Sequence, residues 1–81
     1  MRIINVVEQL QGMITQIRSF PVYEEQLSQD VVTEAENLFK GIINEVVGID
    51  PDSEDMEMII EDGYYTDDNG WDVSIVWSET N

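Results

Sequence analysis

The stretch TDDNGWDVSIVW, residues 66–77, decides the predicted fold. Asn69-Gly70 is the strongest short signal for a tight turn between two antiparallel strands, because such turns need a positive φ at their centre. After the turn, apolar and polar side chains alternate, which is the period-two pattern of a half-buried strand. The apolar members of this strand are Trp71, Val73, Ile75 and Trp77. The sequence therefore predicts a β-hairpin centred on Asn69-Gly70.

The segment before the turn, residues 56–66, is interpreted as the partner strand, because apolar and acidic residues alternate at its start. A two-residue turn pairs Tyr64 with Ile75. Because directly paired side chains share one face of a sheet, this register places Tyr64 in the core and Tyr65 on the opposite face. That opposite face would carry the acids of the hairpin, which are Glu57, Glu61, Asp67 and Asp72.

Two helices are predicted before the hairpin. Across residues 3–19, apolar residues recur at alternating spacings of four and three, like the seam of one helical face. Across residues 28–47 a second apolar stripe has a helical period, and Gly48 follows where a left-handed residue ends a helix. The predicted fold class is therefore α+β. Two helices precede a two-stranded antiparallel hairpin and pack on one of its faces, as a single small domain of residues 1–81.

The composition excludes several classes of function. The chain has 81 residues with 18 acids, 3 bases, no histidine and no cysteine, and its formal net charge is −15. Without thiol or imidazole groups it lacks the usual zinc ligands and nucleophiles, so we expect no enzyme, no cofactor and no metal site. Its charge would repel nucleic acid and anionic membranes, and no apolar run approaches the roughly 20 residues of a membrane span. We expect a cytoplasmic protein.

The acids are concentrated in the second half of the chain. Residues 1–40 carry six acids and three bases, whereas residues 41–81 carry twelve acids and no base. Solubility requires less charge than this, since a net charge of about 2–8 suffices for a small domain. We take ten of these acids, together with one tyrosine that would add an apolar contact, as the candidate partner-binding surface. These residues are Asp50, Asp52, Glu54, Asp55, Glu57, Glu61, Asp62, Tyr65, Asp67, Asp68 and Asp72.

Two other interpretations of the acids stay open. The first is a solvated face that only keeps a small protein soluble. The second is calcium binding, because acids fall at the first, third, fifth and twelfth positions of a calcium-binding loop that would begin at Asp50. Such a loop needs glycine at its sixth position, where this chain has Asp55, which argues against a specific calcium site.

The small size, the strong negative charge, the absence of Cys and His, and the acidic segment from Glu57 to Asp72 resemble a known class of proteins. These are small acidic DNA-mimic proteins, mostly encoded by bacteriophages, which inhibit uracil-DNA glycosylase, restriction enzymes, CRISPR effectors or the nucleoid protein HU. The resemblance implies an inhibitor that occupies the basic DNA-binding surface of a protein in the bacterial host cell. It favours a nucleoid protein such as HU, or a nuclease or CRISPR-type effector, as the target.

The alternative is a non-catalytic, dimeric protein-interaction or regulatory module with a solvated acidic face. A homodimer is predicted because the core is small and the helix expected at residues 3–19 has a heptad-like seam. The seam consists of Ile3, Val7, Leu10, Ile14 and Ile17.

Overall fold

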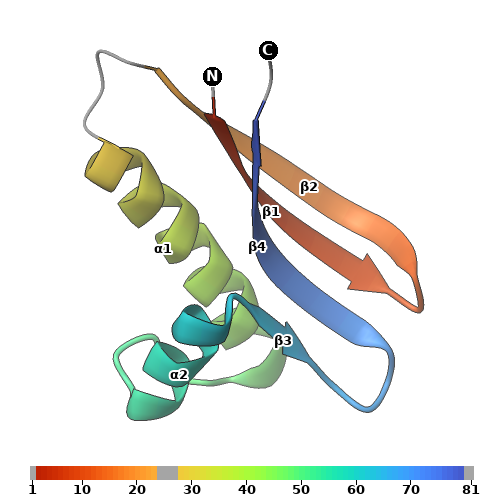
Figure 1. The fold of residues 1–81 in the computed structure, drawn as a ribbon. Helices are drawn as coiled ribbons and strands as arrows, with labels where there is room; N and C mark the ends of the chain where they lie inside the picture. The colour runs from red at the N-terminus through yellow and green to blue at the C-terminus, as the bar shows by residue number, and fades with distance from the viewer. Residues whose placement is uncertain (1, 24–27, 80–81) are drawn as a thin grey trace.

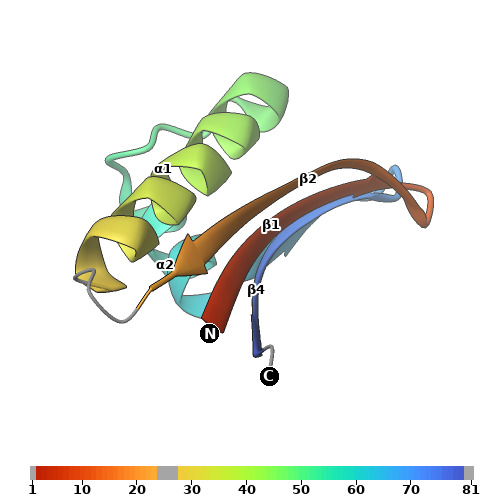
Figure 2. The same cartoon turned by 90° about the horizontal axis from the view of Figure 1, so that it is seen from above.

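The computed structural model describes residues 2–23 and 28–79, which form one antiparallel sheet and two helices. The elements are β1 (Arg2–Leu10), β2 (Met13–Val22), α1 (Ser28–Val47), α2 (Glu54–Asp62), β3 (Tyr64–Thr66) and β4 (Trp71–Glu79). The strand order is β2-β1-β4-β3, so the first and last strands of the chain are central neighbours. Both helices lie on one side of the sheet (Figure 1, Figure 2), and no described residues form a layer on the other side.

The predicted order of two helices and a two-stranded hairpin is wrong, because the observed order is β-β-α-α-β-β. Residues 3–19 lie in the β1–β2 hairpin, whose turn residues Gln11 and Gly12 have φ values of 52° and 81°. Two-residue hairpin turns need such positive φ values. The heptad-like spacing misled the prediction because a spacing of four also keeps Ile3 and Val7 on one face of a strand. The β-branched residues in this segment favoured a strand.

The predicted helix over residues 28–47 is confirmed by α1. It ends where Gly48 adopts a φ of 81° and donates its amide hydrogen to the carbonyl oxygen of Asn44. This is the left-handed ending expected from the sequence. In the described part of the chain, no helix is both long and apolar enough to cross a membrane.

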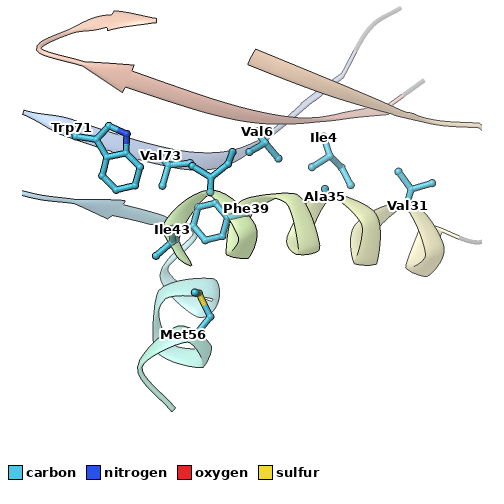
Figure 3. Close-up of a cluster of buried hydrophobic side chains, with 10 residues drawn as sticks. Ile4, Val6, Val31, Ala35, Phe39, Ile43, Met56, Trp71 and Val73 are labelled. Atoms are coloured by element: carbon cyan, nitrogen blue, oxygen red, sulfur yellow. The ribbon is translucent and has the colours of Figure 1, made fainter. Parts of the chain in front are cut away.

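The core lies between α1 and the central strands (Figure 3). Its buried residues are Ile4, Val6, Val31, Ala35, Phe39, Ile42, Ile43, Met56, Trp71 and Val73. Phe39 is fully buried at the middle of α1, and Met56 is the fully buried residue that α2 contributes. Trp71 closes the end near the β3–β4 turn, where its ring centroid lies 5.9 Å from that of Tyr65.

Residues 54–62 form α2, so the strand predicted in this segment is wrong. Ser53 has extended backbone angles, and its hydroxyl oxygen accepts a hydrogen bond of 3.2 Å from the amide of Met56. This is the geometry of a helix N-cap. Gly63 ends the helix with a φ of 81° and donates its amide hydrogen to the carbonyl oxygen of Ile59. These start and stop signals, with three acids in the first turn, outweigh the short alternation of apolar residues.

The predicted turn at Asn69-Gly70 is present between β3 and β4, but it is a three-residue loop. The amide of Asp67 donates to the carbonyl oxygen of Trp71 at 3.0 Å, which leaves residues 68–70 as the loop. Gly70 has a φ of 83°, the left-handed residue with which a three-residue hairpin loop ends.

The longer loop changes the register by one residue and exchanges the two faces of β3. Tyr65, rather than Thr66, is paired with the buried Val73, so Tyr65 faces the core. Tyr64, which was predicted to be in the core, is 57% exposed on the opposite face.

Candidate functional site

Seven of the ten candidate acids lie on one continuous segment, which is the loop before α2 and α2 itself. We call it the α2 acidic segment, and its members are Asp50, Asp52, Glu54, Asp55, Glu57, Glu61 and Asp62. All seven residues are exposed. Figure 1 shows α2 and the preceding loop at the end of the molecule opposite the chain termini. The segment is therefore an accessible patch of carboxylates at one end of the fold.

The helix gives these acids a different arrangement from the predicted row along a strand. Residues three, four and seven apart lie on one helical face, so Glu54, Glu57 and Glu61 share a face of α2. At a rise of 1.5 Å per residue, Glu54 and Glu61 are about 10 Å apart along the helix axis. Met56 lies on the inner face and attaches the helix to the core.

Met58 is an exposed apolar side chain among these acids, with 64% of its surface accessible. It lies four residues after Glu54 and three before Glu61, so it shares their face of the helix. The apolar contact that we predicted for Tyr65 is therefore available at Met58 instead. The sequence signal for this position is the spacing of Met58 from Glu54 and Glu61. That spacing would have indicated a shared face if the segment had been interpreted as a helix.

Hydrogen bonds fix the loop that leads into α2. One carboxylate oxygen of Asp50 accepts from the amide of Asp52 at 2.9 Å, and the Ser53 hydroxyl donates to the Asp50 carbonyl oxygen at 2.7 Å. The same hydroxyl oxygen caps the helix, as described above. The loop and the helix that carry the acids are thus held together by local hydrogen bonds.

The two acids of the β3–β4 turn have different roles. One carboxylate oxygen of Asp67 accepts hydrogen bonds of 2.9 Å from the amides of both Asn69 and Trp71. This carboxylate therefore stabilises the turn, as Asp side chains commonly do. Asp68 makes no such contact in the described structure and is exposed at the tip of the loop.

The remaining two predicted site residues lie apart from the α2 acidic segment. Asp72 is paired with Gln9 and Thr66 on the sheet face that points away from the helices. Tyr65 is half-buried on the opposite face and packs near Trp71. The prediction that Tyr65 and Asp72 belong to one acidic surface is wrong, because it depended on the two-residue turn.

The bases of the chain do not belong to the α2 acidic segment. Arg2 lies over the ring of Trp77 with its guanidinium carbon 4.6 Å from the ring centroid, and Arg18 lies 5.9 Å from the ring centroid of Phe20. Both are cation–π arrangements on the sheet. Residues 41–81 contain no Lys or Arg, so the segment has no cation of its own.

The acids at the C-terminal end of α2 act against its stability. Glu57 and Glu61 are four residues apart, a like-charge pair that costs about 0.2–0.5 kcal/mol. Glu61 and Asp62 also lie at the negative end of the helix dipole, which favours cations. The acids in the first turn lie at the favourable end of the dipole.

The described residues contain no group of three or more acids positioned to hold a metal ion. A hollow of about 190 Å³ lies between α1, the end of α2 and the central strands. Glu36 is the acidic residue in its lining. Its lining is otherwise mostly apolar and consists of Ile4, Val32, Ala35, Glu36, Ile60, Gly63, Ile75 and Trp77. Ligand pockets are usually larger, about 300–1,000 Å³. The α2 acidic segment is an open surface, and its chemistry is attraction of positive charge.

Comparisons with protein-family models, with curated proteins and with solved structures found no match for this chain. The function is therefore inferred from the residues and their geometry.

Proposed function

We propose that this protein is a DNA mimic, which binds the basic DNA-binding surface of a bacterial host protein and blocks access of DNA to it. A nucleoid protein such as HU, or a nuclease or CRISPR-type effector, is the class of target. The observation that carries the proposal is the α2 acidic segment. It presents seven exposed carboxylates within residues 50–62, in a half-chain that contains no base.

The charge density of α2 supports this proposal. Five acids lie on a helix of nine residues, which is about 13 Å long at 1.5 Å per residue. This is one charge per roughly 2.7 Å of axis, compared with about one per 1.7 Å for duplex DNA. A groove lined with Lys and Arg that attracts phosphates would also attract this surface, and the attraction would raise the association rate.

The position of the acids supports binding over mere solubility. Glu61 and Asp62 lie where a cation would stabilise the helix, and Glu57 repels Glu61. Charge for solubility can be placed anywhere on the surface, so it does not require these unfavourable positions. Binding to a basic surface does require acids on one accessible helix face.

A competition experiment tests the proposal. Purified HU is bound to a fluorescent duplex, and this protein is added while the anisotropy of the duplex is measured. We expect the duplex to be displaced. If five carboxylates act as single-strand phosphates do, the affinity for HU should fall on the order of a hundredfold between roughly 50 and roughly 200 mM salt.

Matched variants locate the binding surface. The double substitution Glu57→Gln and Glu61→Gln should weaken displacement roughly tenfold, because two interfacial charges are lost. The control is Asp30→Asn with Glu34→Gln, which removes the same charge from exposed positions on α1. Equal effects of the two double variants would contradict a specific role for α2.

If HU is not bound, the target is sought by capture from a bacterial lysate. The protein is immobilised, and bound proteins are eluted with duplex DNA and, separately, with salt. Elution of a basic DNA-binding protein by duplex DNA supports mimicry of DNA. If bound proteins resist both treatments, the interaction-module alternative is favoured. Leu10 and Met13, which are paired beside the β1–β2 turn and are 46% and 74% exposed, are an apolar contact surface of the kind it needs.

A further inference from the structure

The sheet face that points away from the helices, the open sheet face, is almost free of charge. The strand register assigns residues of all four strands to it, and Asp72 is their one charged member. This contrasts with a chain in which 26% of the residues are charged. A surface that only had to remain in water would not need to exclude charge in this way.

The open sheet face is apolar at its centre. Its larger apolar side chains are Ile3, Val7, Ile14, Ile17, Tyr64 and Val76. Val7 is only 8% exposed although no described layer covers it, because its neighbours on the adjacent strands surround it. Ile17, which is paired with Val7, is 56% exposed, and Val76 on the neighbouring β4 is 47% exposed. Together with Ile14 and Tyr64, which are 60% and 57% exposed, these side chains form an accessible apolar ridge across the face.

The polar side chains beside this ridge satisfy one another. The Ser19 hydroxyl donates to the side-chain oxygen of Asn5 at 2.7 Å, and the Asn5 side-chain nitrogen lies 3.1 Å from the Ser78 hydroxyl oxygen, to which it donates. Covering a polar group is costly mainly when it loses its hydrogen-bond partner. Covering this network would therefore cost little, because its bonds lie within the chain.

We propose that the open sheet face binds a second copy of this chain, sheet against sheet. Two chains of net charge −15 repel each other, and the repulsion is weakest through the face that carries one acid. A basic partner would instead be attracted to the α2 acidic segment. A two-fold axis that lies between the two sheets and runs across the strands reverses the strand direction from one copy to the other. The two copies of Asp72 would then lie at opposite ends of the interface.

The area of the face is compatible with a dimer. At about 4.8 Å between strands and 3.3 Å per residue, β1, β2 and β4 present a projected area of roughly 15 by 30 Å, about 450 Å². Accessible area exceeds projected area where side chains protrude, and stable interfaces bury about 600–1,000 Å² per partner. The face therefore approaches the lower part of that range. The dimer would carry its two α2 acidic segments on the outer sides.

The proposal changes the geometry of the predicted dimer. Four of the five residues in the predicted helical seam, Ile3, Val7, Ile14 and Ile17, lie on the open sheet face instead. The proposal is independent of the DNA-mimic function, because the α2 acidic segment lies on the other side of the sheet.

The mass of the full chain in solution, measured by sedimentation equilibrium, tests the proposal. We expect twice the 9.3 kDa of one chain. Ile17→Lys and Val76→Lys should each give a single-chain mass, since each buries a charge in the interface. Met58→Lys is the matched control with the same charge change at an exposed site on α2, and it should remain dimeric. Circular dichroism checks that each variant keeps its fold, which is expected because all three side chains are exposed.

Cross-linking gives a second readout that does not depend on destabilising variants. The chain has no cysteine, so a single Ser74→Cys substitution on the open sheet face reports on that face alone. We expect Ser74→Cys to form a disulfide-linked dimer on oxidation and Met58→Cys to remain largely unlinked. A single-chain mass for the unmodified protein would overturn the proposal. Dimers that persist in the Val76→Lys variant would also overturn the proposal. They would indicate pairing through another surface, such as the edge strand β2, which does not involve Val76 on the central strand β4.

Discussion

The indole nitrogen Nε1 of Trp71 donates a hydrogen bond of 2.7 Å to Oε2 of Glu8, a residue 63 positions earlier in the chain. Glu8 is half-buried on the helix-facing side of β1, where it is paired with Val73. The bond gives a partner to the one polar atom of a side chain that is 6% exposed. It also links the first strand to the last, beside the β3–β4 turn.

This bond predicts a difference between two substitutions of Glu8. Glu8→Ala should lower the free energy of unfolding by about 1–2 kcal/mol, because the buried indole N–H loses its acceptor. Glu8→Gln removes the same charge but keeps a carbonyl oxygen as acceptor, so its loss should be clearly smaller. Urea unfolding followed by tryptophan fluorescence measures both. Equal losses would mean that the acceptor is unimportant.

The two methionines of α2 test whether this segment is a helix. Met56 is fully buried and Met58 is 64% exposed, whereas a strand would place both on one face. Met56→Ala should destabilise the fold by about 2–5 kcal/mol, as large-to-small changes in a core do. Met58→Ala should change stability by less than about 0.5 kcal/mol. Similar losses at both positions in urea unfolding would contradict the helix.

The elements predicted correctly from the sequence are those with more than one agreeing signal. For α1, twenty residues of helical period end at Gly48. In residues 3–19 the spacings of four fit either a helix or a strand. The spacings of three fit a regular strand poorly, but the Gln11-Gly12 turn and the register shift between β1 and β2 interrupt the pattern, and Gln-Gly is a weaker turn signal than Asn-Gly. In residues 54–62 the apolar alternation covered only a few positions, and the capping residues Ser53 and Gly63 were the more reliable signal.

The candidate site was predicted in part for the same reasons. The acids of residues 50–62 could be named from composition alone, because nothing in that half of the chain neutralises them. Tyr65 and Asp72 required the exact register of β3 against β4. That register depends on whether the loop has two or three residues, and Asn69-Gly70 is compatible with both.

The cap of α2 connects its stability to binding. Ser53→Ala removes the acceptor for the Met56 amide and should cost about 1 kcal/mol, whereas Ser53→Asp keeps an acceptor. Hydrogen exchange at the Met56 amide should therefore be faster than in the original protein for Ser53→Ala, but not for Ser53→Asp. If the proposed target requires an ordered α2, its affinity should fall in the same variant, although no charge is changed. Unchanged exchange would show that the cap contributes little.

Two glycines should respond in opposite directions to alanine. Gly41 lies within α1, and a Cβ added there meets no atom within 4 Å, so Gly41→Ala should stabilise the fold by about 0.5–1 kcal/mol. Gly70 has a φ of 83°, and an added Cβ would lie 3.2 Å from Cγ of Gln11. Gly70→Ala should therefore be destabilising by about 1 kcal/mol or more. Thermal unfolding of both variants, with melting temperatures shifted in opposite directions, checks this prediction.

Glu61 should show a conflict between stability and binding. Glu61→Gln removes a charge from the unfavourable end of the α2 dipole and its repulsion with Glu57, so we expect about 0.5–1 kcal/mol of added stability. The same change should weaken binding to the proposed basic target, because it removes a carboxylate from the exposed face. Glu34→Gln, at an exposed site in the first half of α1, is the control for net charge. Urea unfolding and the competition assay measure the two effects separately. A variant that is more stable and binds as well as the original protein would indicate that the acids of α2 serve only solubility.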